Sequence, residues 1–70
     1  MNLSYDQMAT FHAVARHGSF SKAAVSLFRS QSAVSIQVAK LEGALGRRLF
    51  DRTTKYFALT EAGEVLQRYV

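Results

Sequence analysis

The sequence predicts a mainly α-helical domain, in which three core helices are followed by a two-stranded β-hairpin and the start of a fourth helix. Two observations predict this fold class. Apolar residues recur at helical spacing in four segments that have Ser, Thr or Gly at their ends, and one further segment is short and aromatic. A chain of 70 residues forms one small domain, and its 49% of apolar residues is normal for a globular one. The absence of cysteine excludes a disulfide framework and a thiolate metal site.

The first helix is expected from about Ser4 to His17. Ser4 is a favourable N-cap, and Gln7, three residues later, completes a capping-box pattern in which each side chain bonds the other residue's amide. Gly18 is a suitable stop, because glycine readily adopts the left-handed conformation that follows many helices.

A short second helix is expected from a cap at Ser19 or Ser21 to about Phe28, with Ala23 and Ala24 on its inner face. Small side chains let another helix approach closely, so this helix and the next one fit a helix-turn-helix. In DNA-binding proteins with this motif, the second helix of the pair lies in the major groove and reads bases near its N-terminus.

The third helix is expected from Ser30 or Gln31 to Gly46. Its apolar stripe consists of Val34, Val38, Leu41 and Leu45. The opposite face is mostly small or polar and holds Ser32, Ser35, Ile36, Ala39 and Lys40. Ile36 lies about 200° around the helix from Val34, so it points away from the core. It is either an ordinary exposed apolar residue or a contact for a thymine methyl group.

Residues 47–59 are expected to form the hairpin around a Thr-Thr-Lys tip, although no Asn-Gly or Asp-Gly turn supports it. Its position after the helix pair makes it a wing, so the predicted fold is a winged helix-turn-helix. Thr60 then caps a fourth helix. The apolar stripe of that helix continues to the last residue and consists of Ala62, Val65, Leu66, Tyr69 and Val70.

The charge distribution indicates a polyanionic partner. Nine Lys and Arg residues against five Asp and Glu give a formal net charge of +4. Between residues 22 and 55, seven basic residues stand against two acidic ones, Glu42 and Asp51, for which the sequence offers no evident partner. A basic middle region favours nucleic acid, although an ordinary solvated surface or a site for acidic membranes would carry the same charge.

Other function classes are less well supported. His12 and His17 lie about 140° apart around one helix, and there is neither metal-ligand spacing nor a phosphate loop, so no enzyme, metal or other cofactor is expected. No apolar run is long enough for a membrane span, and no membrane partner is expected. A winged helix that binds protein is the main alternative, but it does not need the basic region. RNA binding is weaker, because the aromatic residues lie on core stripes.

Together, several short segments resemble the N-terminal winged helix-turn-helix of LysR-type transcriptional regulators over almost the whole chain. They are residues 20–24 (FSKAA), 30–35 (SQSAVS), 41–42 (LE), 45–46 (LG), 49–52 (LFDR) and 59–64 (LTEAGE). The resemblance implies bacterial, cytoplasmic, nucleoid-associated, sequence-specific binding of double-stranded DNA. Residues 1–59 would form the DNA-binding domain, with the recognition helix at about 31–45 and the wing at about 47–59.

The resemblance also assigns residues to contacts with DNA. Base-reading positions fall on Gln31, Ser32, Ser35 and Ile36. Lys55 falls on the wing position that enters the minor groove, while Ser21, Arg52 and Thr60 match positions for backbone contacts or structural support. The charge pattern adds Lys22, Arg29 and Lys40 as backbone contacts.

Three departures from the family pattern affect these assignments. Ser32 stands where proline is common, which removes rigidity and adds a hydroxyl. Ile36 stands where arginine is frequent, so one guanine-reading fork is absent. Phe28 and Arg29 stand where a polar and then an apolar residue is usual; either Arg29 reaches a phosphate or the turn has a different shape.

The resemblance further implies a homodimer that pairs through the linker helix, of which residues 60–70 are the expected start. The interface would include Val65, Leu66, Tyr69 and Val70, and a tetramer is possible in the full-length protein. Family members carry a larger C-terminal domain that binds a small-molecule effector. The chain is therefore expected to be a DNA-binding fragment that ends inside the linker helix.

Overall fold

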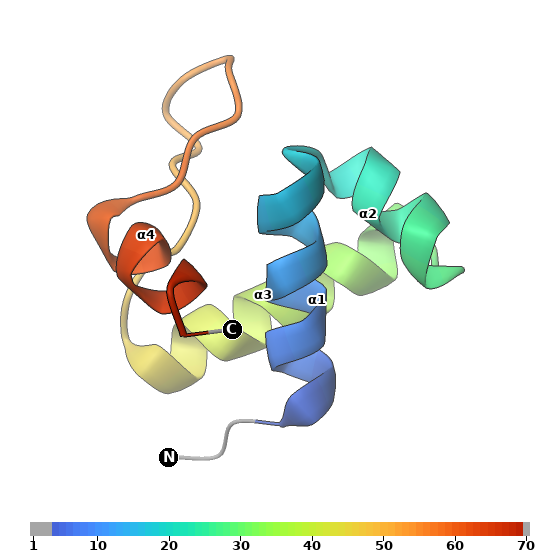
Figure 1. Cartoon of the computed structure of the whole chain (residues 1–70), viewed down its shortest axis with the longest axis horizontal. Coiled ribbons are helices and arrows are strands. Elements are labelled where there is room, and N and C mark those ends of the chain that lie inside the picture. The colour runs from blue at the N-terminus through green and yellow to red at the C-terminus, as the bar shows by residue number, and fades with distance from the viewer. Residues whose placement is uncertain (1–3, 70) are drawn as a thin grey trace.

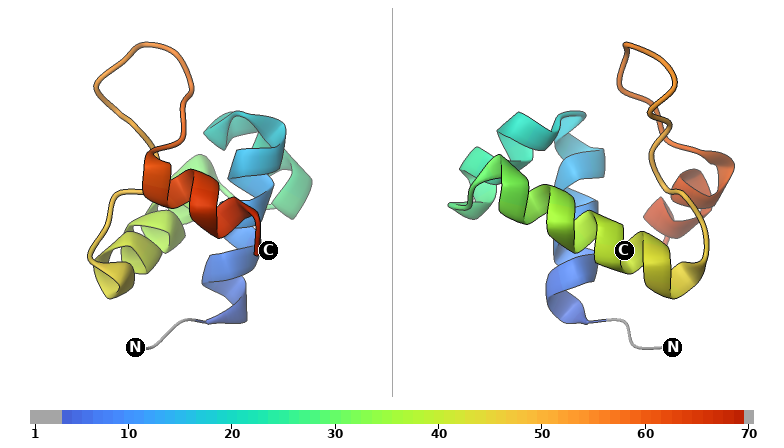
Figure 2. Two further views of the ribbon diagram at one scale, coloured as in Figure 1. Left: turned by 60° about the vertical axis from the view of Figure 1, so that its left-hand side comes forward. Right: turned by 180° about the vertical axis from the view of Figure 1, so that it is seen from behind.

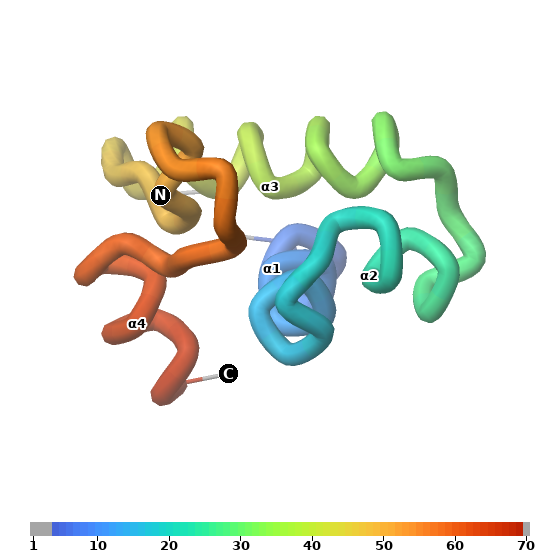
Figure 3. Tube along the Cα trace, turned by 90° about the horizontal axis from the view of Figure 1, so that it is seen from above, coloured from blue at the N-terminus to red at the C-terminus, as the bar shows by residue number. Residues whose placement is uncertain are grey.

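The computed structural model describes residues 4–69, which contain four helices. They are α1 (Tyr5–His17), α2 (Phe20–Leu27), α3 (Gln31–Leu45) and α4 (Glu61–Gln67). Helix α1 crosses α3, α2 lies beside α1, and α4 is set apart on the other side of α1, as Figures 1 and 3 show. The prediction of a mainly helical domain with four helices is confirmed.

The core lies where α1, α2 and α3 meet. Its buried apolar residues are Phe11, Ala13, Val14, Ala23, Ala24, Val34, Val38, Leu41, Leu49 and Phe50. Three members of the stripe predicted for the third helix are completely buried, and Leu45 packs against the cluster from its edge. The rings of Phe11 and Phe20 both contact that of Phe50, at centroid distances of 5.4 and 5.3 Å. Phe50 begins the long loop that follows the core helices, so it anchors this loop in the helical core.

Side-chain caps define where the four helices begin. Ser4, Ser19, Ser30 and Thr60 each accept a hydrogen bond from the amide three residues ahead, at 3.0–3.1 Å. Such a cap supplies an acceptor to one of the four amides that have no partner within the helix. Gly18 and Gly46 follow α1 and α3 with φ of 65° and 67°, as predicted.

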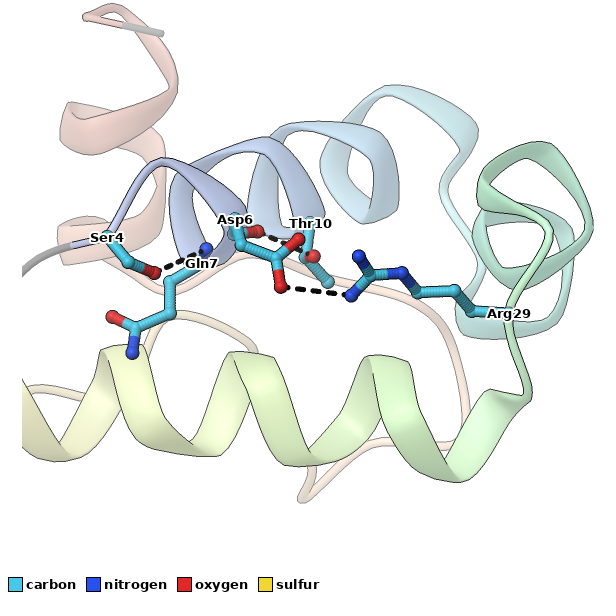
Figure 4. A network of polar contacts seen from close by, with 5 residues as sticks. All are labelled: Ser4, Asp6, Gln7, Thr10 and Arg29. Carbon is cyan, nitrogen blue, oxygen red and sulfur yellow. Dashed lines mark hydrogen bonds and ion pairs between the residues drawn. The ribbon is translucent and has the colours of Figure 1, made fainter.

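The capping box predicted at the first helix is only half formed. Ser4 Oγ accepts the amide of Gln7, but the amide group of the Gln7 side chain extends toward α3 (Figure 4). Its Oε1 is buried and has no hydrogen-bond partner among the described residues. The prediction of a second hydrogen bond, between the Gln7 side chain and the amide of Ser4, is therefore wrong. Packing against α3 determines the direction of the Gln7 side chain instead.

The fourth helix is shorter than its apolar stripe predicts. It ends at Gln67, and the amides of Arg68 and Tyr69 bond the carbonyls three residues back, at 3.2 and 2.9 Å. These bonds form a tighter turn than an α-helix. The prediction for Val70 lies outside the described residues.

Residues 50–59 form a loop that projects from the helical body (Figure 1). Phe50 and Leu59 make one antiparallel bridge, flanked by bonds from Asp51 N to Ala58 O (2.9 Å) and from Thr60 N to Leu49 O (3.0 Å). No longer ladder occurs in the part of the chain that the structure describes, so the two-stranded hairpin remains a prediction.

Side chains replace cross-strand bonds at the tip of this loop. Asp51 Oδ1 accepts bonds from the hydroxyl and the amide of Thr53, which hold the pKa of Asp51 below its usual value. Thr54 Oγ1 donates to Tyr56 O at 2.7 Å and accepts from Tyr56 N at 3.0 Å. The tip is therefore shaped by short-range side-chain bonds, and Asp51, for which the sequence offered no partner, has one.

The turn between α2 and α3 contains an unfavourable backbone conformation. Phe28 ends α2 with φ 56° and ψ 43°, and its side chain is 97% exposed. Residues with a Cβ atom rarely adopt this left-handed region. In compensation, the amides of Phe28 and Arg29 bond the carbonyls of Val25 and Ala24 at 3.2 and 3.0 Å.

We expect Phe28→Gly to stabilise the domain by about 0.5–1 kcal/mol, because glycine adopts this conformation without steric cost and the lost side chain buries almost nothing. Urea unfolding measures the effect. Phe28→Ala is the control, since it removes the ring but keeps the Cβ atom, and it should give little gain. An equal gain from both variants would show that the backbone conformation is not the cause.

Candidate nucleic-acid interface

Helices α2 and α3 pack through small residues. Ala23 is completely buried and Ala24 is 5% exposed on the inner face of α2, and Val34 of α3 is completely buried. The absence of bulky side chains on α2 lets the two helices approach closely, and the three residues after Leu27 make the turn between them. This is the helix-turn-helix that the alanine pair predicted.

The face of α3 that lies opposite the core is open. Ser32 and Lys40 are exposed on this face, Ser35 is partly exposed, and Ile36 is 54% exposed, while Gln31 is exposed at the start of the helix. Ile36 therefore points away from the core, as its helical position predicted. The described part of the chain leaves this face uncovered, and most of its side chains are short enough to let a second surface approach closely.

A groove joins the first half of α3 to the projecting loop. Gln31 and Ser35 line it from α3, and Arg52 and Lys55 line it from the loop. In both views of Figure 2, the loop and α2 rise on the same side of the molecule. The fold thus brings together four predicted DNA contacts, up to 24 positions apart in the sequence. Ser32 and Ile36 lie outside this groove.

Aromatic side chains complete the groove and were not predicted as part of the site. Phe20, Tyr56 and Phe57 also line it, and Tyr56 is 73% exposed. The ammonium group of Lys55 lies 5.5 Å from the centroid of the Tyr56 ring. The available signal was the pairing of an aromatic residue with a basic one at a loop tip, where no core packing requires the ring.

Arg52 is held from two sides. Its guanidinium lies 3.6 Å from a carboxylate oxygen of Glu42 and 5.4 Å from the centroid of the Phe20 ring. The other carboxylate oxygen of Glu42 accepts the amides of Leu49 (2.8 Å) and Phe50 (3.4 Å). The partners of Glu42, which the sequence did not indicate, are these two backbone amides and the loop arginine.

Arg29 pairs with an acidic residue of α1. Its Nη1 lies 3.0 Å from Asp6 Oδ2, and both side chains are about half exposed (Figure 4). Thr10 donates a hydrogen bond to the carbonyl of the same Asp6 at 2.7 Å. An exposed pair of this kind contributes at most about 1 kcal/mol, so Arg29 can exchange it for a phosphate at little cost. The assignment of Arg29 as a phosphate contact remains a prediction.

Ser21 and Gln31 contact each other directly. The hydroxyl of Ser21, in the first turn of α2, donates to Oε1 of Gln31, the first residue of α3, at 2.9 Å. Lys22 is exposed on α2 beside this pair. Two residues assigned separately to the DNA backbone and to the bases thus form a single unit.

A second, apolar groove separates α4 from the end of α3. Its apolar lining consists of Leu45, Leu49, Ala62, Val65, Leu66 and Tyr69. Val65 is 45% and Tyr69 81% exposed, whereas Leu66 packs against the core. Of the residues predicted for a dimer interface, two are therefore open to a partner and one is partly used by the domain itself.

Neither a metal-binding cluster nor a membrane-spanning helix occurs in the described residues. Residues 4–69 bring no three His, Asp or Glu side chains close enough together to bind a metal ion. Within the same residues, each helix is too short or too polar to traverse a bilayer.

The structure combines a short helix, a turn, a helix with an uncovered face and an adjoining basic loop. These features define the class of this protein as a helix-turn-helix DNA-binding domain. The chain belongs to the lysR family of bacterial regulatory helix-turn-helix proteins, whose family model matches residues 5–64. Its matches are transcriptional regulators, which do not form an enzyme family.

Curated relatives are regulators of greater length. The chain is 48% identical over 69 residues to a RuBisCO operon transcriptional regulator from Allochromatium vinosum, a match that covers 99% of this chain and 23% of the relative. It is 50% identical over 64 residues to a probable RuBisCO transcriptional regulator from Porphyra purpurea, covering 91% and 20%. The chain thus spans about a fifth of the length of these relatives.

Solved structures show the same arrangement of helices. The BenM_DBD/catB site 1 DNA complex matches with a TM-score of 0.90 and 31% identity, covering 96% of this chain and 75% of that one. Vibrio fischeri DarR in complex with DNA matches with a TM-score of 0.92 and 30% identity, covering 99% of this chain and 24% of that one. The four helices of this chain are therefore arranged as in the DNA-binding domains of LysR regulators.

Proposed function

We propose that the chain binds double-stranded DNA sequence-specifically, with α3 in the major groove and residues 47–59 as a wing at the minor groove. The observation that carries the proposal is the groove that joins Gln31 and Ser35 of α3 to Arg52 and Lys55 of the loop. Amide and hydroxyl groups suit base edges, and cationic side chains suit phosphates, so one surface supplies both kinds of contact.

Each part of this surface has its own role. Gln31, Ser32, Ser35 and Ile36 read bases, because they lie on the uncovered face in the N-terminal half of α3. Lys22, Arg29, Lys40 and Arg52 contact phosphates, and Lys55 enters the minor groove, where the negative potential is concentrated if the groove is narrow. With Ile36 in place of an arginine, one guanine contact is replaced by an apolar contact with a thymine methyl.

A second copy of the chain pairs with the first through α4. Val65 and Tyr69 expose apolar surface beside the groove under α4, which supports the proposal. Residues 1–59 form the DNA-binding domain, and residues 60–70 begin a linker helix. In the whole regulator, which works in the bacterial cytoplasm on the nucleoid, a small-molecule effector acts through a C-terminal domain, and a tetramer is possible.

Selection of bound duplexes from a random library, at stated salt, tests this function. We expect enrichment of two half-sites about one helical turn apart. The logarithm of the binding constant should fall linearly with the logarithm of the salt concentration, because several basic side chains displace counterions. A slope near zero together with no enriched sequence would overturn the proposal.

Two single-charge variants separate the wing from the recognition helix in the same measurement. Lys55→Ala and Lys40→Ala should each reduce the salt slope by about one. Only Lys55→Ala should weaken binding more on A·T-rich flanks than on G·C-rich ones. Equal weakening on both flanks would make Lys55 a plain phosphate contact and not a minor-groove residue.

A further inference from the structure

We propose that Ser21 is a positioning residue for base recognition, which holds the Gln31 side chain in place for contact with the DNA. The inference rests on the proposed function, and it begins from the hydrogen bond that Ser21 Oγ donates to Gln31 Oε1 at 2.9 Å. The two residues are ten positions apart on different helices, so the bond spans the helix-turn-helix and does not follow from local chain geometry.

The bond determines what Gln31 can offer to a base. A glutamine amide has an acceptor oxygen and a donor NH2 group, and without a fixed orientation it can present either one. A serine hydroxyl can donate to the amide oxygen or accept from the amide nitrogen; in this structure Ser21 donates to the oxygen, which leaves Nε2 for a partner. An amide held in this way favours base acceptors such as N7 of a purine, O6 of guanine or O4 of thymine over the N4 amino donor of cytosine.

Neither the start of α3 nor the stability of the fold requires the bond between Ser21 and Gln31. The N-cap of α3 is Ser30, whose hydroxyl accepts the amide of Ala33, so the helix start does not depend on Gln31. Both Ser21 and Gln31 are exposed, and their bond therefore contributes little to folding. The bond instead reduces the number of rotamers that Gln31 adopts in the free protein, which lowers the entropy lost on binding DNA.

The test measures binding of this chain to four duplexes. They are the duplex most enriched from the random library and its three single-base variants at the position where Gln31→Ala loses discrimination. Ser21→Ala should reduce discrimination at that position by about 2- to 10-fold, which is the effect expected for releasing one flexible side chain. Ser21→Thr keeps the hydroxyl and should restore most of the discrimination.

Two further variants separate positioning from other roles. Ser26→Ala removes an exposed serine from the same helix and should change neither affinity nor discrimination. In a chain that already carries Gln31→Ala, adding Ser21→Ala should have no further effect on base preference, because nothing remains to be positioned. The melting temperature of Ser21→Ala should match that of the unsubstituted chain.

Distinct outcomes overturn the inference and the proposed function. If the unsubstituted chain binds all four duplexes equally, neither the base readout nor the inference holds. If it discriminates and Ser21→Ala leaves discrimination intact, only the inference fails. A loss of affinity that is equal on all four duplexes, and that persists in the Gln31→Ala background, would make Ser21 a phosphate contact instead.

Discussion

Gly63→Ala should destabilise the domain by about 2–3 kcal/mol, although alanine is normally the better residue inside a helix. Gly63 is buried in α4, and a Cβ atom added there would overlap the carbonyl oxygen of Leu49 and lie 3.1 Å from Leu59 Cδ2. The first of these neighbours is backbone, so it cannot move aside as the end of a flexible side chain can. We therefore expect α4 to separate from the base of the loop.

Gly43→Ala is the matched control for this substitution. Gly43 also lies inside a helix, but a Cβ atom added there meets nothing within 4 Å. We expect this variant to be more stable than the unsubstituted chain by about 0.5–1 kcal/mol, because alanine loses less backbone entropy on folding. Urea unfolding of both variants gives the comparison. Stabilisation by Gly63→Ala would mean that α4 does not pack closely on the backbone of Leu49.

The contrast between the two glycines shows what the sequence could and could not predict about the fold. Helix starts depend on side chains within three residues, so Ser4 and Thr60 could be identified as caps without the structure, and Ser19 as one of two candidates. A glycine required by a neighbour 14 positions away carries no such local signal. The half-formed capping box at Gln7 has the same explanation, since a distant helix directs its side chain.

The candidate site also has features that the sequence could predict and features that it could not. Helical periodicity alone places Ser32, Ser35 and Ile36 on the face of α3 opposite the core, and in the structure all three are at least partly exposed. Periodicity could not show that Gln31 and Ser35 line a groove with Arg52 and Lys55, because that depends on how the loop leaves the core at Phe50. The bond between Ser21 and Gln31 depends on how α2 and α3 pack, and no pattern in the sequence indicates it.

The attachment of the loop to the core depends on one buried carboxylate. Glu42 is 8% exposed near the end of α3, where it accepts the amides of Leu49 and Phe50 and pairs with Arg52. Neither of these amides donates to a backbone carbonyl in the part of the chain that the structure describes, so no backbone bond of the loop replaces Glu42. A buried amide left without an acceptor loses its hydration and gains nothing in return.

Glu42→Ala should consequently destabilise the domain by about 2–3 kcal/mol, since it leaves two buried amides without a partner. Hydrogen exchange at Leu49 and Phe50 should accelerate more than exchange within α1, because the base of the loop opens first. The unfolding free energy in urea and the exchange rates of these amides are the two measurements.

Two controls separate the hydrogen bonds of Glu42 from its charge. Glu42→Gln keeps one acceptor oxygen and removes the charge near Arg52, so its destabilisation should be about half as large, or less. Glu64→Ala removes an exposed carboxylate from α4 and should cost no more than about 1 kcal/mol. If Glu42→Ala were no more harmful than Glu64→Ala, the amides of Leu49 and Phe50 would have other acceptors. The loop that carries Arg52 and Lys55 toward α3 would then not depend on this carboxylate.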